Sequence, residues 1–371
     1  MKNHHFLPVF LTLIVSYISF HLYSASWIAR NLAMSGGAAR TIRIVFLLLA
    51  LFSPFTMFLR RHYTNPALDL FYTAGYAWMG IILLAGSVFI FSDILHPLAR
   101  RILAPAAVNN FGAAVLAALA FILIYSFYEG LKTPDVKEIR LAIPGLPKSM
   151  EGLKIAQISD MHIDSAYKLR QLSNAIDLIN ARKPDLVFIT GDLLDPGLNG
   201  QARLKALIGN IESRLGVFGV LGNHEYYFGY EKSVACYKEC GIKLIRNEAA
   251  DAGGIGIIGL NDIATEKMTE KDITDILAKS RAGAFSLVMS HQPLMYETIT
   301  GSGDFLVLSG HVHRGQIFPF HLFTRLFYKY FYGIYRIKNS FFYVTSGSGT
   351  WGPPMRFLAP SEIPIITLVK S

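Results

Sequence analysis

Four apolar stretches in the first 131 residues constrain the fold of this chain most strongly. A helix needs ~20 apolar residues to cross about 30 Å of hydrocarbon, and most of these stretches reach that length. Their short connections carry arginines, and aromatic residues stand near their ends, as in the headgroup zone of a bilayer. The sequence therefore predicts an N-terminal four-helix transmembrane region over residues 1–131, with spans at Phe6–Ala29, Thr41–Leu59, Leu70–Leu95 and Val108–Tyr128.

The few polar residues of this region favour packing over transport. His21 and Asp93 lie toward the ends of their stretches, and buried polar contacts between membrane helices commonly hold helices together. The first stretch is not followed by a small-residue cleavage site, which disfavours a removable signal peptide. Of the net charge of +9, much flanks the apolar stretches, so it indicates membrane anchoring and no nucleic acid is expected as a partner.

The side of the membrane is weakly specified. An even number of spans puts the N-terminus and residues 132–371 on the same side, but the basic residues of the loops divide six to five between the two sides. The two cysteines, Cys236 and Cys240, are predicted to be free buried thiols, which suits a reducing compartment. We therefore expect a multi-pass protein of the cell inner membrane with residues 132–371 in the cytoplasm.

Residues 132–371 change to short apolar runs separated by amphipathic stretches and by Gly, Asn and Asp turns, which is typical of an α/β domain. We expect helices at Lys168–Arg182, Ala202–Glu212, Glu231–Cys240 and Glu270–Lys279. Strands are expected at Glu138–Ile143, Leu153–Ser159, Leu186–Thr190, Val217–Leu221, Gly256–Leu260, Phe285–Met289, Phe305–Leu308, Phe341–Thr345 and Ile363–Val369.

Asp, His and Asn residues follow directly after five of these strands. Loops at strand ends are free to converge while the sheet holds them, so ligands gather there. Each motif alone is weak, because a single histidine beside a strand is usually structural. Their combination, in this order and with this placement of glycine, is a specific signal. The motifs are Asp160-Met161-His162, Gly191-Asp192-Leu193-Leu194-Asp195, Gly222-Asn223-His224-Glu225, Ser290-His291 and Ser309-Gly310-His311-Val312-His313.

In these motifs the sequence resembles the calcineurin-like metallophosphoesterase superfamily, as D-x-H, G-D-x-x-D, G-N-H-E, a lone H and G-H-x-H over about Leu153 to His313. The resemblance implies an α/β fold, a four-layer αββα metallophosphoesterase sandwich over residues 132–371, with two divalent metal ions. The ligands that it implies are Asp160, His162 and His313 for one metal, Asn223, His291 and His311 for the other, and Asp192 as a bridge between them.

The residue types suit phosphate-ester hydrolysis. A phosphate ester is anionic, so it repels hydroxide unless cations neutralise it and acidify a bound water. Imidazole, carboxylate and amide ligands favour Mn²⁺, Fe²⁺ or Zn²⁺. The resemblance also implies that His224 faces the substrate with Asp195 behind it, and a histidine so oriented can protonate a leaving alkoxide. The alternative for Asp195 is a turn cap near Pro196-Gly197, and for Glu225 a cap or salt bridge is favoured over catalysis.

The membrane segments and the closing stretch Gly347–Pro354 resemble a bacterial membrane-associated branch of the superfamily, which includes UDP-diacylglucosamine pyrophosphatases and related phosphodiesterases. Relatives often carry the motif G-H-T-H-G-G-Q, whereas this chain has Arg314 in place of the small residue after the second histidine. We expect the guanidinium of Arg314 to contact a substrate phosphate. The segment Ile317–Arg336 mixes aromatic residues with bases, which favours contact with an anionic membrane surface. The alternative is an insertion packed over the catalytic face.

The predicted function is therefore a membrane-anchored di-metal phosphoesterase that hydrolyses a phosphodiester or pyrophosphate bond, with a lipid-linked substrate as a hypothesis. One alternative is a catalytically silent membrane scaffold or sensor that retains the fold, and the complete ligand set disfavours it. Another is a transporter regulated by its C-terminal domain, and the scarcity of polar residues in the spans disfavours that. Substrate, metal and oligomeric state stay open.

Overall fold

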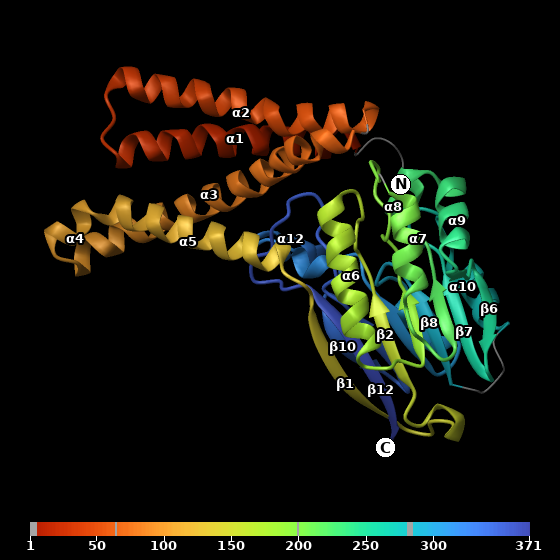
Figure 1. The fold of residues 1–371 in the computed structure, drawn as a ribbon. Coiled ribbons are helices and arrows are strands. Elements are labelled where there is room, and N and C mark those ends of the chain that lie inside the picture. The colour runs from red at the N-terminus through yellow and green to blue at the C-terminus, as the bar shows by residue number, and fades with distance from the viewer. Residues whose placement is uncertain (1–5, 64, 199, 280–284) are drawn as a thin grey trace. The chain divides into compact units, whose positions relative to one another are not determined.

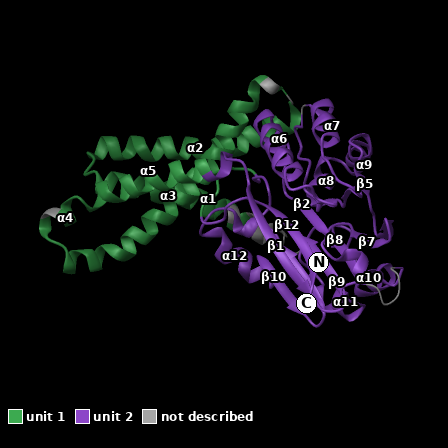
Figure 2. Cartoon of the chain, turned by 60° about the horizontal axis from the view of Figure 1, so that its bottom comes forward, with its two compact units in different colours: residues 1–128, 352–357 green, residues 129–351, 358–371 purple. Residues whose placement is uncertain are grey.

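The computed structural model describes residues 6–63, 65–198, 200–279 and 285–371, and within these the side chains of residues 6–10, 13, 66 and 106 are not described. Contacts divide the chain into two compact units (Figure 2). Unit 1 holds residues 1–128 together with 352–357, and unit 2 holds residues 129–351 and 358–371. The predicted domain boundary lay between residues 131 and 132, with Gly352–Phe357 in the C-terminal domain.

Unit 1 is helical. Its helices are α1 (Phe6–Asn31), α2 (Gly36–His62), the 3-10 turn η2 (Pro66–Leu68), α3 (Asp69–Ile102), α4 (Pro105–Asn109) and α5 (Phe111–Leu131), of which residues 129–131 belong to unit 2. Within the described residues, three helices are long and apolar enough to cross a membrane, namely α2, α3 and α5.

The prediction of four spans is therefore corrected to three within the described residues. Helix α1 forms where the span Phe6–Ala29 was expected, but it is not among the three candidate spans of the described residues. Part of the prediction falls on residues 6–10 and 13, whose side chains lie outside the description. The part of α1 that is described carries polar groups, including Ser16, Ser19, Ser24 and Ser26, which lower its hydropathy.

Polar side chains within unit 1 bind one another. Trp27 donates its indole N–H to Ser92 Oγ at 3.0 Å, and Arg30 forms an ion pair with Asp93 at 2.7 Å. His21 is fully buried and accepts a hydrogen bond from the indole of Trp78 at 3.0 Å. These contacts fit the packing role expected for polar residues between helices.

Unit 2 contains two six-stranded sheets, as drawn in Figure 1. The first has the order β1-β12-β2-β3-β4-β5, in which only the β12–β2 pair is antiparallel. Its strands are β1 (Asp135–Ile143), β2 (Lys154–Ile158), β3 (Leu186–Ile189), β4 (Gly216–Gly219), β5 (Lys243–Leu244) and β12 (Glu362–Lys370).

The second sheet has the order β10-β11-β9-β8-β7-β6, with antiparallel pairs at its two edges and parallel pairs inside. Its strands are β6 (Glu248–Ala252), β7 (Ile255–Leu260), β8 (Ser286–Ser290), β9 (Phe305–Ser309), β10 (Gly333–Ile337) and β11 (Ser340–Val344). The central strands β8, β9 and β11 are buried along their whole length, as their continuous apolar runs require.

Three apolar clusters hold unit 2 together. One joins side chains of both sheets, including Phe188 of the first and Leu306 of the second. The second packs α6 (Ala166–Asn180), α7 (Gln201–Gly209) and α9 (Tyr230–Glu239) on the first sheet, and the third packs α10 (Glu270–Leu277) and α11 (Tyr296–Gly301) on the second. The mixed α/β fold expected from the sequence is confirmed.

The expected strands and helices of this unit form close to the expected bounds, and the sequence missed β5, β6 and β10. It also missed the short helices α8 (Asn223–Phe228), α11 and α12 (Phe320–Phe327), and the 3-10 turns η3 (Lys148–Met150) and η4 (His313–Gly315). The expected free thiols are confirmed, since Cys236 and Cys240 are buried and unbridged.

Candidate metal centre

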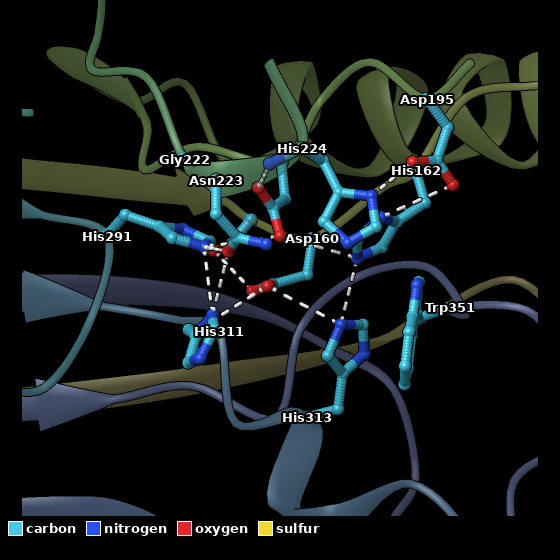
Figure 3. Close-up of polar contacts among 12 residues, drawn as sticks. Asp160, His162, Asp195, Gly222, Asn223, His224, His291, His311, His313 and Trp351 are labelled. Atoms are coloured by element: carbon cyan, nitrogen blue, oxygen red, sulfur yellow. Dashed lines mark hydrogen bonds and ion pairs between the residues drawn. The ribbon is translucent and has the colours of Figure 1, made fainter. Parts of the chain in front are cut away.

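The loops after β2, β3, β4, β8 and β9 bring the predicted ligands together, and Figure 3 shows their side chains pointing toward one another. Hydrogen bonds from backbone N–H groups to side-chain carboxylates join these loops. The N–H of His311 donates to Asp160 Oδ1 at 2.9 Å, and the N–H of His224 donates to Asp192 Oδ1 at 2.9 Å. Residues separated by 151 and 32 positions in the chain thus share one site.

The first group of side chains is Asp160, His162 and His313, whose candidate ligand atoms lie within 4.8 Å of one another. His162 Nε2 lies 3.0 Å from His313 Nε2, and His313 Nε2 lies 3.5 Å from Asp160 Oδ1. All three residues are buried.

The second group is Asp192, His291 and His311, with Asn223 beside them. Asn223 Oδ1 lies 3.2 Å from His291 Nε2 and 3.1 Å from His311 Nδ1, and these two nitrogens are 3.2 Å apart. Asp192 Oδ2 lies 3.2 Å from His291 Nε2 and 3.8 Å from His162 Nε2, so one carboxylate oxygen faces both groups.

The donor set fits divalent metal ions. His291 Nε2, His311 Nδ1 and Asn223 Oδ1 converge within hydrogen-bond distance, although an amide oxygen carries no proton and a neutral imidazole donates from only one nitrogen. Such a convergence of nitrogen and oxygen atoms suits a shared cation. On the other side, His162 Nδ1 faces Asp195 Oδ2 at 3.6 Å, which leaves Nε2 directed at His313 and Asp192. Nitrogen and oxygen ligands without thiolate suit borderline or hard divalent ions.

Burial and neighbouring charges shift the pKa values of two histidines in the site. Burial disfavours the charged form of His291, but the carboxylates of Asp192 and Asp160 outweigh it and raise its pKa to about 10. Burial and the neighbouring charge of His291 lower the pKa of His311 to about 3. The two histidines of this group thus lie in opposite electrostatic surroundings, His291 beside carboxylates and His311 beside another imidazole.

His224 and Asp195 form the pair that the sequence predicted. His224 Nδ1 and Asp195 Oδ1 share a short hydrogen bond at the start of α8, and the His224 ring lies edge-on to His162 with centroids 4.4 Å apart. Burial opposes ionisation of Asp195, yet the imidazoles of His162 and His224 lower its pKa below the usual range. Burial likewise opposes the charged form of His224, whereas Asp195 raises its pKa above the ordinary value.

Glu225 has a structural task that the motif alone did not reveal. Its fully buried carboxylate accepts hydrogen bonds from the N–H groups of Asp192 at 2.9 Å, Leu194 at 2.9 Å and Gly222 at 2.7 Å, and from the Tyr237 hydroxyl at 3.2 Å. The expected capping role is confirmed, because Glu225 accepts the N–H of Gly222, the residue at the N-cap of α8. In addition, it ties the loop after β3 to the loop after β4.

Two glycines allow the ligand loops to approach closely. A Cβ on Gly222 would lie 2.2 Å from Asp192 Oδ1, and a Cβ on Gly310 would lie 2.0 Å from Ser159 Oγ and 2.2 Å from Asp160 Oδ2. Any larger residue would therefore displace a metal-facing carboxylate.

The backbone of the site is unusual as well. Non-glycine residues rarely adopt positive φ, and such strain gathers at functional sites. Six of the predicted site residues do so, at φ values from 46° to 69°, namely Asp160, His162, Asp192, His311, His313 and Arg314.

Three further side chains were not predicted from the sequence. The Tyr328 hydroxyl lies 2.7 Å from His311 Nε2, and burial with the charge of Asp262 raises the pKa of Tyr328 to about 12. The ring of Trp351 lies 6.0 Å from that of His224, and its backbone N–H and carbonyl are bound by Gln316. The closing stretch noted in the sequence contains Trp351, whereas no sequence signal distinguished Tyr328 from its aromatic neighbours.

Arg314 follows the predicted ligand His313 in η4, and its guanidinium lies 4.4 Å over the ring of Tyr332. No contact that the structure describes joins Arg314 to the predicted ligands, so its role toward a phosphate stays a prediction.

Comparison with known proteins agrees with this arrangement. A family model described as calcineurin-like phosphoesterase matches residues 153–315. A Campylobacter jejuni protein named as an uncharacterized metallophosphoesterase is 37% identical over 262 residues, which covers 68% of either chain. A Helicobacter pylori protein of the same description is 36% identical over 247 residues, and the match spans 66% of this chain and 66% of that protein's length. A Danio rerio protein named transmembrane protein with metallophosphoesterase domain is 28% identical over 280 residues, or 71% of this chain and 64% of that protein.

Proposed function

Because this chain belongs to the metallophosphoesterase family, we propose that it is a membrane-anchored enzyme that hydrolyses a phosphodiester or pyrophosphate bond at a centre of two divalent metals. The observation that carries the proposal is the position of Asp192, whose carboxylate lies between two groups of buried metal-competent side chains. The proposed fold of this catalytic domain, residues 132–371, is a four-layer αββα sandwich, supported by the three apolar clusters described above.

The proposed assignment of residues to the two metals follows from the distances described above. Asp160, His162 and His313 would hold one metal, Asn223, His291 and His311 would hold the other, and Asp192 would contact both. When bound, two such ions neutralise the phosphate oxygens and acidify a water molecule. The ions are Mn²⁺, Fe²⁺ or Zn²⁺ on the chemistry of the ligands.

The chain's own residues supply the proton that the leaving group needs. His224 projects into the site from the start of α8, and Asp195 fixes its ring through Nδ1. This orientation leaves Nε2 to protonate the departing alkoxide, as a histidine backed by a carboxylate does in other hydrolases.

Membrane anchoring is supported by α2, α3 and α5, and by relatives from Danio rerio and Bos taurus that are named as transmembrane proteins. We place the protein in a cell inner membrane, multi-pass, with the catalytic domain in the cytoplasm. A substrate carried by a lipid follows from this location, and Arg314 is the proposed contact to one of its phosphates.

The test is hydrolysis by the purified full chain with Mn²⁺, measured on bis-p-nitrophenyl phosphate and on a panel of nucleotide-linked lipids. We expect turnover of at least one substrate and loss of turnover in Asp192→Ala. A wild-type chain that binds these lipids and hydrolyses none would instead favour the silent scaffold or sensor.

The role of Arg314 has its own measurement within this assay. Arg314→Ala should raise KM, whereas the exposed Arg203→Ala on α7 should leave KM unchanged. Equal KM values for the two variants would remove Arg314 from the substrate site.

A further inference from the structure

Helix α12 exposes its apolar face to the outside and turns its polar face toward the protein. Its residues His321 and Thr324, and Tyr328 at its C-cap, recur at the spacing of one helical face and are partly buried. A Cβ on Gly315 would lie 2.3 Å from His321 Cα. A surface helix normally buries its apolar face and exposes its polar one. Here the face toward the protein carries the histidine and the threonine.

The opposite face of α12 is apolar and exposed. Leu326 and Phe327 each expose 80% of their surface, and Leu322 and Phe323 expose 52% and 55%. No residue of this helix is buried. Large contiguous apolar patches of this kind mark sites that contact another apolar phase.

The basic residues near α12 indicate what kind of surface its apolar face contacts. The segment Ile317–Arg336 contains Arg325, Lys329 and Arg336 and no acidic residue. Lys329 pairs with Glu297 at 2.6 Å, and the exposed Arg325 lies 5.8 Å over the ring of Phe331. Apolar side chains flanked by arginine suit an anionic lipid surface, where the rings enter the headgroup zone and the cations meet lipid phosphates.

We propose that α12 lies in the lipid–water interface and inserts Leu322, Phe323, Leu326 and Phe327 into an anionic leaflet. The occupant of this face is the bilayer, because the same chain carries three helices able to cross one. The proposed contact of α12 is with lipid and not with a partner protein.

The C-terminal end of this helix reaches the metal centre. Tyr328 caps α12 by donating its N–H to the Thr324 carbonyl at 3.0 Å, and its hydroxyl lies 2.7 Å from His311 Nε2. A phosphate borne by a lipid headgroup would thus meet the metals while its acyl chains stay in the leaflet. This second step rests on the proposed function, whereas the lipid contact does not.

Spin labelling of the full chain tests the contact. Leu326→Cys and, as control, Lys271→Cys are labelled and reconstituted into vesicles of phosphatidylethanolamine and phosphatidylglycerol. The side chain of Lys271 on α10 is 82% exposed, and wild type reports any labelling of the buried Cys236 and Cys240. Oxygen concentrates in the bilayer and a nickel chelate in water, so oxygen should relax the label at 326 more strongly and nickel the label at 271.

Two results would overturn the proposal. Nickel relaxation at 326 equal to that at 271 would put α12 in water, and protection from both relaxants would mean that protein covers it, either unit 1 or a second copy of the chain.

A second variant separates lipid docking from catalysis. Leu322→Gln/Leu326→Gln changes only exposed side chains, so it should fold and keep its rate on bis-p-nitrophenyl phosphate. Turnover of a lipid-linked substrate in vesicles should fall severalfold, and an unchanged rate would contradict the docking role. Failure of wild type to hydrolyse either substrate would refute the proposed function, while the relaxation data would still decide where α12 lies.

Discussion

Replacing Glu225 with alanine should separate the two ligand loops that its carboxylate holds together. The substitution leaves three buried backbone N–H groups without an acceptor, at Asp192, Leu194 and Gly222. Each buried unpaired donor costs about 1–3 kcal/mol, and water entering the vacated space offsets part of this, so we expect a loss of about 3–5 kcal/mol. For a unit of this size, that corresponds to a Tm lower by about 6–20 °C.

The assay is thermal unfolding of the full chain in detergent at one scan rate, with a chelator present so that loss of metal does not contribute. Glu239→Ala, an exposed glutamate at the end of α9, is the matched control and should change stability by less than ~0.5 kcal/mol. Glu225→Gln should restore part of the loss, because one amide oxygen can accept the N–H groups of Asp192 and Gly222, whereas the amide nitrogen cannot accept that of Leu194. A Tm for Glu225→Ala equal to that of the control would refute the structural role of this carboxylate.

Three other substitutions address the centre itself. His224→Ala should lower kcat by about 10²–10⁴-fold while metal content, measured by mass spectrometry, stays at the wild-type level; a parallel loss of metal would make His224 a ligand instead. Gly310→Ala should reduce bound metal, whereas Gly301→Ala, whose Cβ meets nothing within 4 Å, should not, and equal metal content in both would refute the argument from close approach. Tyr328→Phe should weaken metal affinity by about 10–100-fold in a chelator competition, since it removes the hydroxyl at His311 Nε2, and unchanged affinity would make Tyr328 a packing residue only.

The sequence predicted the parts of the fold where local pattern and burial agree. The continuous apolar runs of β3, β8 and β9 are buried on both faces, and polar residues immediately after them had few explanations besides a site. The candidate ligands could therefore be placed on the correct loops, and the structure brings their side chains together.

What the sequence missed depends on contacts distant in the chain. Strand β10 begins with Gly333 and is nowhere fully buried, and only its pairing with β11 at a sheet edge makes it a strand. Helix α12 has its apolar face outward, so its pattern does not distinguish a membrane contact from core packing. The segment Gly352–Phe357 belongs to the helical unit, where the Arg356 N–H donates to the Ser126 carbonyl at 2.9 Å. No local pattern in the sequence indicated this.

Metal content of the purified full chain tests the account most directly. After loading with Mn²⁺ and removal of free ions, mass spectrometry should find about two ions per chain in wild type and clearly fewer in Asp192→Ala, because that carboxylate faces both groups of ligands. A wild-type chain that holds at most one ion, or an Asp192→Ala chain that holds as many as wild type, would contradict a bridged pair of metals.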